Sequence, residues 1–244
     1  MRGLGAAAIL RIWERDDKCP PAMRAVNLLA AEQRCEEMDL PTITIGARDA
    51  ALLALRQNTF GSIMHAHTKC PACGEAVELM LPVAEFIAMR TGTEAPWHQS
   101  YELAQGDWVV RFRLPTAGDL LNVHAGEGDP RVQILQCCVA DVACAGVVCG
   151  FEELPEALYA PIAQRMEELD PCADIQLNLA CPVCKTAWTA QLDILAYLWA
   201  EITAHARRLL REVDSLARAY GWSEQDILAM SSQRRRAYLE LCGI

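Results

Sequence analysis

Apolar residues recur at helical spacing through the first quarter of the chain. Two helices are predicted over residues 6–33, separated at Pro20-Pro21, because a proline ring breaks a helical hydrogen-bond ladder. A third helix is predicted from Ala47 to about Thr59, since leucines form an apolar run there and Gly61 follows as a stop signal. We therefore expect residues 1–61 to form a helical N-terminal segment.

Two later stretches change to the two-residue alternation of half-buried strands. In residues 62–90 this alternation follows the turn Cys70-Pro-Ala-Cys73, and in residues 172–193 it flanks the turn Cys181-Pro-Val-Cys184 on both sides. Each stretch then runs into a helical pattern. The pattern predicts two similar hairpins, each with a pair of cysteines on its turn.

Residues 91–171 lie between the two hairpins and are predicted to form a folded α/β insertion. Gly, Pro, Thr, Gln and Ser are frequent up to Gly106 and indicate a loop, while residues 108–114 have the pattern of a strand. Residues 131–149 are apolar and rich in cysteine, and their periodicity favours neither helix nor strand. An amphipathic helix is predicted over residues 155–169, whose apolar positions share one face.

The pattern becomes helical again in residues 194–244. Asp193 is a suitable N-cap for a long helix that ends at Tyr220, where Gly221 acts as the stop signal. Two short helices are predicted after it, each preceded by a capping serine.

Composition and charge limit the classes of protein to which the chain can belong. The chain of 244 residues can bury a sizeable core without a metal, and its 52% hydrophobic and 22% charged residues are typical of a globular protein. No apolar stretch approaches the ~20 residues of a membrane helix, and the N-terminus lacks a signal-peptide pattern. We therefore expect no membrane contact and cytoplasmic synthesis and residence. The net charge of −10 disfavours general binding to nucleic acid.

The two cysteine turns predict one structural zinc site formed by Cys70, Cys73, Cys181 and Cys184. Two C-P-x-C turns that face each other supply four thiolates, the ligand set of a tetrahedral Zn²⁺ site. Four protein ligands leave no open position for water, so such a site has a structural and not a catalytic role. The turns are far apart in sequence, and a folded insertion between them accounts for this separation because loop-closure entropy grows slowly with length. The expected fold class is α+β, mainly helical, with two zinc-linked hairpins in a split zinc ribbon and a helical insertion.

Other readings of the cysteines and histidines stay open. The two C-x-x-C pairs would be redox-active in a thiol oxidoreductase, although that role is typical of a motif at a helix start. His65 and His67 lie on one face of a predicted strand and are either extra ligands or residues of a solvated face. Five further cysteines are either small buried hydrophobes or a second metal or redox cluster: Cys137, Cys138, Cys144, Cys149 and Cys172. Cys19, Cys35 and Cys242 are isolated and are expected to be small buried hydrophobes.

Sequence motifs of common enzymes are absent. The chain contains no G-x-G-x-x-G, P-loop, G-x-S-x-G or H-E-x-x-H motif. We therefore predict a binding or assembly protein without catalytic residues.

The C-terminal segment combines arginines with aromatic residues and is the predicted partner-binding surface. A basic and aromatic helical end suits an acidic partner or phosphates, whereas the alternative is amphipathic packing with arginines that extend over apolar neighbours. A zinc-ribbon regulator that binds nucleic acid through these arginines is the rival function. The candidate residues are Arg207, Arg211, Trp222, Arg234, Arg235 and Tyr238.

Several segments together resemble proteins encoded in phage-tail-like contractile injection clusters, similar to the baseplate hub and baseplate assembly-chaperone proteins of T-even phages. The resemblance covers nearly the whole chain and is strongest in its C-terminal quarter. Lys185 is a departure, because a glycine commonly follows the second cysteine turn. The segments that carry it are residues 9–14, 48–56, 70–74, 112–116, 169–171, 181–184 with Trp188, 220–228 and 235–240.

The resemblance implies an accessory role in assembling the baseplate of a contractile tail. Hub or spike subunits are the implied partners. The implied location is the bacterial cytoplasm or an assembled tail-like particle.

Overall fold

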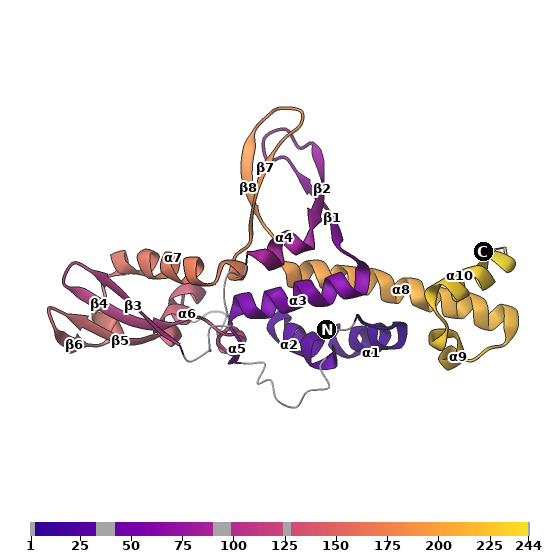
Figure 1. Ribbon diagram of the computed structural model, residues 1–244, viewed down its shortest axis with the longest axis horizontal. Helices are drawn as coiled ribbons and strands as arrows, with labels where there is room; N and C mark the ends of the chain where they lie inside the picture. Colours follow the sequence, from indigo (N-terminus) through magenta and orange to yellow (C-terminus); the bar gives the residue numbers. More distant parts are fainter. Residues whose placement is uncertain (1–2, 33–41, 90–98, 124–127, 244) are drawn as a thin grey trace.

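The computed structural model of the protein describes residues 3–32, 42–89, 99–123 and 128–243. Figure 1 shows an elongated molecule with a helical body at its centre and a sheet-containing lobe at one end. Two hairpins project from the middle of the body, and the chain ends at the side opposite the lobe. We call these parts the body, the lobe, the arm and the C-terminal end.

Four helices form the body: α1 (Ala6–Asp16), α2 (Pro21–Glu32), α3 (Ile45–Phe60) and α8 (Ile194–Tyr220). Each has an apolar face, and the four faces meet in one core. The sequence prediction of these helices is confirmed, including the stop of α3 at Gly61, whose φ is 103°. Buried core residues from the four helices include Ile9, Leu28, Leu52, Leu53, Leu198 and Ile202.

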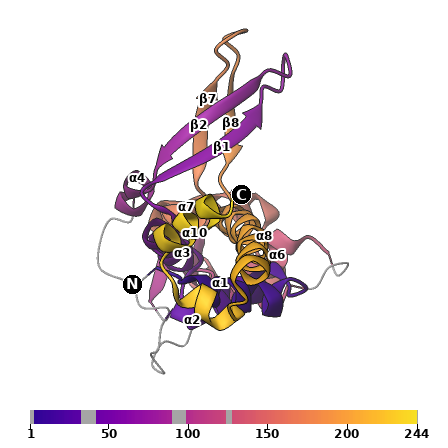
Figure 2. The same cartoon turned by 90° about the vertical axis from the view of Figure 1, so that its right-hand side faces the viewer.

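The arm consists of two antiparallel hairpins that rise together from the body in both views (Figures 1 and 2). The first is β1 (Ile63–Lys69) with β2 (Ala76–Pro82), and the second is β7 (Gln176–Ala180) with β8 (Ala187–Gln191). Half-buried and exposed positions alternate along β2, β7 and β8, as the sequence pattern predicts. The short helix α4 (Val83–Ala88) returns the first hairpin to the body.

The lobe contains one antiparallel sheet of four strands in chain order. It has its own core, in which Phe112, Leu135 and Ile162 are buried. The strands are β3 (Ser100–Gln105), β4 (Trp108–Arg113), β5 (Val139–Cys144) and β6 (Val147–Cys149). The helices are α5 (Ala117–Leu121), α6 (Pro130–Cys138), η2 (Phe151–Glu153), η3 (Glu156–Leu158), α7 (Tyr159–Leu169) and η4 (Pro171–Ala173).

Two expectations for this region need correction. The description of the insertion as helical is wrong, because a four-stranded sheet forms its centre. The loop expected up to Gly106 contains β3, in which only Tyr101 and Leu103 turn toward the core, too few to outweigh the surrounding turn-forming residues. Residues 131–149 are both helix and strand: α6 changes into β5 at Val139 without a proline or glycine to mark the boundary.

The lobe joins the body at the N-terminus of α3. The Gly46 N–H donates to Asp170 Oδ2 at 2.8 Å, which places a buried carboxylate at the positive end of a helix. A Cβ on Gly46 would overlap this carboxylate, so glycine is required there. Two backbone hydrogen bonds beside it, Ile45 N–H to Pro115 O and Ala117 N–H to Ile43 O, complete the junction.

The C-terminal end folds back on α8. Gly221 has a left-handed φ of 71° and ends the long helix, and α9 (Glu224–Ala229) and α10 (Ser232–Leu241) follow. Ser223 and Ser231 accept hydrogen bonds from the first turns of these helices, as predicted. No helix among the described residues is long and apolar enough to cross a membrane.

Candidate metal centre

The two cysteine turns have the same backbone geometry. In the first turn, the Cys70 N–H donates to Glu75 O at 2.8 Å and the Gly74 N–H donates to Cys70 O at 2.9 Å. The second turn repeats both bonds, from Cys181 to Thr186 and from Lys185 to Cys181, at 2.9 and 3.1 Å. The similarity predicted for the two hairpins therefore extends to their turns.

Lys185 occupies the position that Gly74 has in the first turn. Its φ is 64° and that of Gly74 is 75°, so both residues are in the left-handed region. A residue with a Cβ is strained in this region. The lysine departs from the usual residue type but keeps the turn geometry.

The four cysteine sulfurs form one compact group. All lie within 4.8 Å of one another, with 3.5 Å between the sulfurs of Cys70 and Cys184 and 3.6 Å between those of Cys73 and Cys181. Tetrahedral Zn–S bonds of ~2.3 Å place neighbouring sulfurs about 3.8 Å apart, close to these distances. A disulfide needs about 2.05 Å, so these contacts are between separate sulfurs. The arrangement is compatible with metal binding.

One cysteine of each turn faces inward and one faces solvent. Cys70 and Cys181 are buried, whereas Cys73 and Cys184 are exposed. The group lies at the end of the arm that is distant from the body (Figure 1). It joins the hairpins where the body no longer holds them together.

In the thiol form without metal, the exposed sulfurs differ in proton affinity. The Thr186 side chain, with a backbone hydrogen bond at the same residue, lowers the pKa of Cys184 to about 6. A backbone hydrogen bond at Glu75 acts in the same direction on Cys73, but the neighbouring thiols, Cys184 first, raise its pKa to about 12. The opposite shifts reflect one shared group, in which the first negative charge lies on Cys184.

The remaining cysteines do not form a second metal group among the described residues. Cys138 and Cys172 are buried, as expected for small hydrophobes, but Cys137 is exposed. Cys35 lies outside the described residues. His65 and His67 are exposed on β1 and do not join the four sulfurs.

The residues predicted to bind a partner lie on α8, α10 and the turn after α8. Arg207 and Arg211 are exposed on α8. The rings of Trp222 and Tyr238 pack edge to face at 4.8 Å and join this turn to α10, which also carries Arg234 beside the Tyr238 ring. Arg235 is not on this surface: it is buried and pairs with Glu212 at 2.9 Å.

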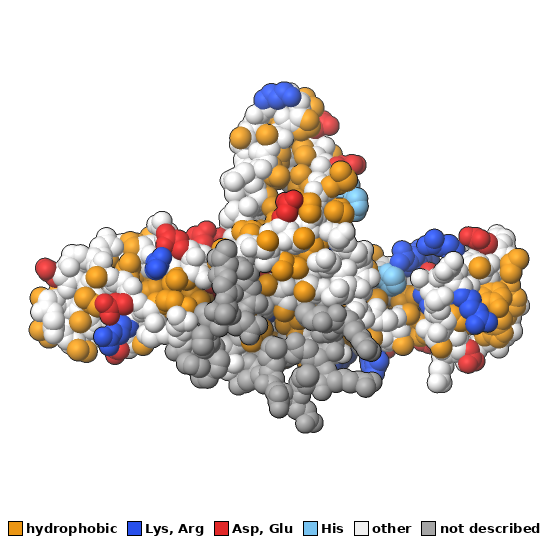
Figure 3. Space-filling model, viewed as in Figure 1, with side chains coloured by type: hydrophobic (Ala, Val, Ile, Leu, Met, Phe, Trp, Pro, Cys, Tyr) orange, Lys and Arg blue, Asp and Glu red, His pale blue; other side chains and the backbone are white. Residues whose placement is uncertain are grey.

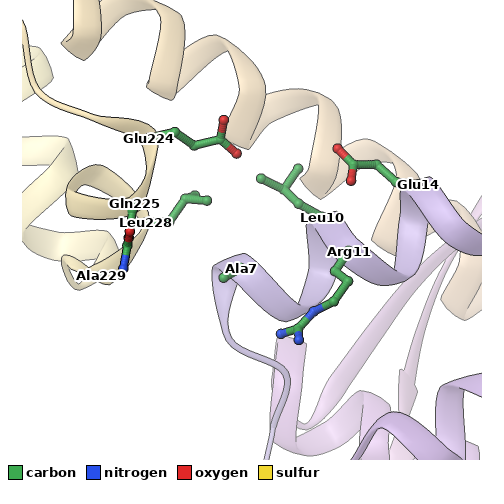
Figure 4. Close-up of a pocket in the computed structure, with 8 residues that line it drawn as sticks. All are labelled: Ala7, Leu10, Arg11, Glu14, Glu224, Gln225, Leu228 and Ala229. Carbon is green, nitrogen blue, oxygen red and sulfur yellow. The ribbon is translucent and has the colours of Figure 1, made fainter.

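A groove that sequence patterns did not indicate lies between α1 and α9 (Figure 4). Its volume is about 590 Å³, and it combines the apolar Leu10 and Leu228 with the charged Arg11, Glu14 and Glu224. These residues come from opposite ends of the chain, so no local motif could have revealed them. The groove is formed by helices of the body and C-terminal end, not by the arm.

The comparison with known families gives one match. The family model described as T4 bacteriophage base plate protein matches residues 27–197, which is more than half of the chain. The chain belongs to this family, and the resemblance to T-even baseplate proteins is confirmed. The match includes both cysteine turns but ends at Tyr197, before most of the C-terminal stretch that carries the strongest resemblance. No curated protein and no solved structure matches the chain.

Replacing Lys185 with glycine tests the left-handed position. The substitution Lys185→Gly relieves strain and is expected to raise the free energy of unfolding by about 0.5–1 kcal/mol, because part of the gain is offset by greater backbone freedom in the unfolded chain. Chemical denaturation of the purified protein measures this change. The matched control is Gly74→Lys, expected to destabilise by a similar amount; equal stability of both variants and the parent would contradict the assignment.

The pKa difference predicts selective alkylation of the metal-free protein. At pH 7 a thiol with a pKa of about 6 is about 90% thiolate, whereas a thiol with a pKa of about 12 is almost entirely protonated, so Cys184 should react with iodoacetamide at least tenfold faster than Cys73, which is also exposed. Mass spectrometry of the labelled peptides measures both rates. Thr186→Val should raise the Cys184 pKa and slow its labelling. Faster labelling of Cys73 would show the opposite charge distribution.

Proposed function

We propose that this member of the T4 bacteriophage base plate protein family is a non-catalytic accessory protein in baseplate assembly of a contractile tail-like injection system. In this proposal, Cys70, Cys73, Cys181 and Cys184 bind one structural Zn²⁺ ion. The ion holds the two hairpins together as one arm, and the arm contacts hub or spike subunits. The observation that carries the proposal is the group of four sulfurs at the far end of the arm.

The chemistry of the four ligands supports zinc. Four thiolates in tetrahedral positions suit Zn²⁺ or iron and do not suit magnesium or calcium, which prefer oxygen. Four thiolates around a divalent ion leave a net charge of −2. Lys69 and Lys185 are exposed beside the ligands, and basic side chains are visible at the tip of the arm in Figure 3. Their charges offset part of this excess.

The low stability of isolated hairpins supports a metal that links the two hairpins of the arm. A two-stranded hairpin is at best marginally stable in water by itself, and each hairpin here pairs only within itself. A metal bound to both turns joins them into one unit, and its binding free energy contributes to folding. All four ligands come from the protein, which supports a structural role and leaves no open position for a substrate.

Side chains at the base give the arm a fixed attachment to α8. The Tyr197 hydroxyl donates to His65 O at 2.8 Å. Arg56 forms two hydrogen bonds with Glu201, at 2.7 and 2.9 Å, and a third with Gly61 O just before β1. A paired arginine with a bidentate carboxylate is geometrically specific, which suits an arm that must present its tip in one direction.

The surface of the arm supports a role in protein contacts. Met80 on β2 is 73% exposed and Val183 on the second cysteine turn is 64% exposed. Exposed apolar side chains on a projecting element are typical of a surface that another protein covers. Both residues lie within the stretch that matches the family.

The metal site is tested with Cys181→Ser. We expect this variant to lose stoichiometric zinc and to show faster amide exchange in both hairpins, because the site joins segments that are distant in sequence. Elemental analysis measures the metal and also distinguishes zinc from iron. Cys137→Ser, which removes an exposed cysteine of the lobe, is the matched control. Full zinc occupancy and unchanged thermal stability in Cys181→Ser would falsify the shared site.

The assembly role is tested by purifying the tagged chain from a cell that expresses the native gene cluster. Hub or spike subunits are expected to co-purify, and Met80→Glu should reduce their recovery at least tenfold without changing the zinc content. Met23→Glu, at a partly exposed site on α2, is the control. A tail that assembles and contracts normally without this gene would contradict the role.

A further inference from the structure

The negative charge of the protein is concentrated in one part of the chain. Residues 91–171 contain thirteen acidic and four basic residues, a net charge of −9 out of the total of −10. The rest of the chain is therefore almost neutral as a group. This concentration coincides with the lobe.

Part of this charge is exposed and has no local counterion. Glu152, Glu156 and Glu167 are exposed near the lobe surface, and no ion pair to them occurs within the described part of the chain. Two other acidic residues of the lobe, Asp119 and Asp170, are buried and bonded within the fold. The exposed group is thus available for a basic surface.

The C-terminal end has the opposite charge. Residues 207–244 contain seven arginines and five acidic residues, a net charge of +2. Arg207 and Arg211 lie four residues apart on the side of α8 opposite the buried Leu209 and Leu216, so both point to solvent. Among the described residues, neither guanidinium has a hydrogen bond or an ion pair. Figure 3 shows basic side chains over α10 and the end of α8.

Exposed apolar side chains accompany the charges at both ends. In the lobe, Val147 and Val148 are 69% and 77% exposed on β6, an edge strand with only one neighbour. At the C-terminal end, Leu241 is 77% exposed and Leu210 is 38% exposed. Apolar side chains with charged residues around them are the usual composition of a protein interface, and an exposed apolar edge strand is a site that another chain tends to cover.

The two surfaces lie at opposite ends of the long axis (Figure 1) and so cannot meet within one molecule. We propose that the acidic lobe of one copy binds the basic C-terminal end of a second copy, so that the chain self-associates head to tail. A contact between two lobes is disfavoured, because each carries a charge of −9. The contact is heterologous, and its repetition forms a ring or an open filament. This proposal does not depend on the metal centre.

The test is the mass of the purified, metal-loaded chain in sedimentation-velocity experiments. At about 50 mM NaCl we expect the average mass to rise with concentration to at least twice the 26.9 kDa of one chain. At about 500 mM NaCl the mass should return to that of one chain, since screening weakens contacts between exposed charges. A single-chain mass at low salt at every concentration would overturn the proposal.

Charge reversal identifies the two surfaces. Arg207→Glu with Arg211→Glu, and separately Glu152→Arg with Glu156→Arg, should each abolish association at low salt. An equimolar mixture of the two variants should restore association between pairs, because the unmodified acidic lobe of the first variant then meets the unmodified basic C-terminal end of the second. Arg131→Glu, a reversal at an exposed lobe arginine, makes the lobe more acidic and should not weaken association. Circular dichroism and zinc content verify folding. Association that persists in either variant alone, or a mixture that stays at the single-chain mass, contradicts head-to-tail binding.

Discussion

The contact between two cysteine turns that are far apart in sequence is the constraint on which the arrangement of the arm depends. Each hairpin pairs only within itself, so backbone hydrogen bonds do not fix one hairpin relative to the other. At the base, hydrogen bonds from Tyr197 and Arg56 hold the first hairpin against the body. At the tip, the four sulfurs lie within 4.8 Å of one another and bring the two turns together. A compact group of four cysteine sulfurs, two of them buried, is a strong reason to infer a metal there, since four thiolates repel one another without a cation.

The same constraint explains how a large lobe can lie in sequence between the two hairpins of one arm. The chain leaves the first hairpin, forms the lobe with its own core, and returns through Asp170 to begin the second hairpin. Asp170 contacts Gly46 at the start of α3, so the return point is fixed against the body before β7 begins. The separation in sequence is therefore large, while the chain enters the second hairpin from a point that is held against the body. Loop-closure entropy offers little resistance to such an insertion once the lobe is folded.

Local signals in the sequence were enough to predict the elements that have a strong hydrophobic periodicity or a distinct capping residue. Asp193 and Gly221 bracket α8 as expected, and the paired cysteine turns indicated the group of four sulfurs. Elements defined by tertiary contacts were harder: β3 has two core-facing residues, and α6 becomes a strand with no breaker at the boundary. The buried Arg235 shows the same limit, because its partner Glu212 is 23 residues away and exposure is not encoded by charge.

The position of the charges along the chain gives information that neither the total charge nor the secondary structure contains. A net charge of −10 suggests a uniformly acidic surface, whereas −9 of it lies within residues 91–171. The long-range field of such a molecule is that of a charged lobe beside a nearly neutral body, so partners are oriented by the lobe as they approach. The proposed metal site of the arm and the proposed electrostatic contacts of the two ends involve separate residues. In these proposals, one chain keeps a fixed arm while its contacts with other copies respond to salt.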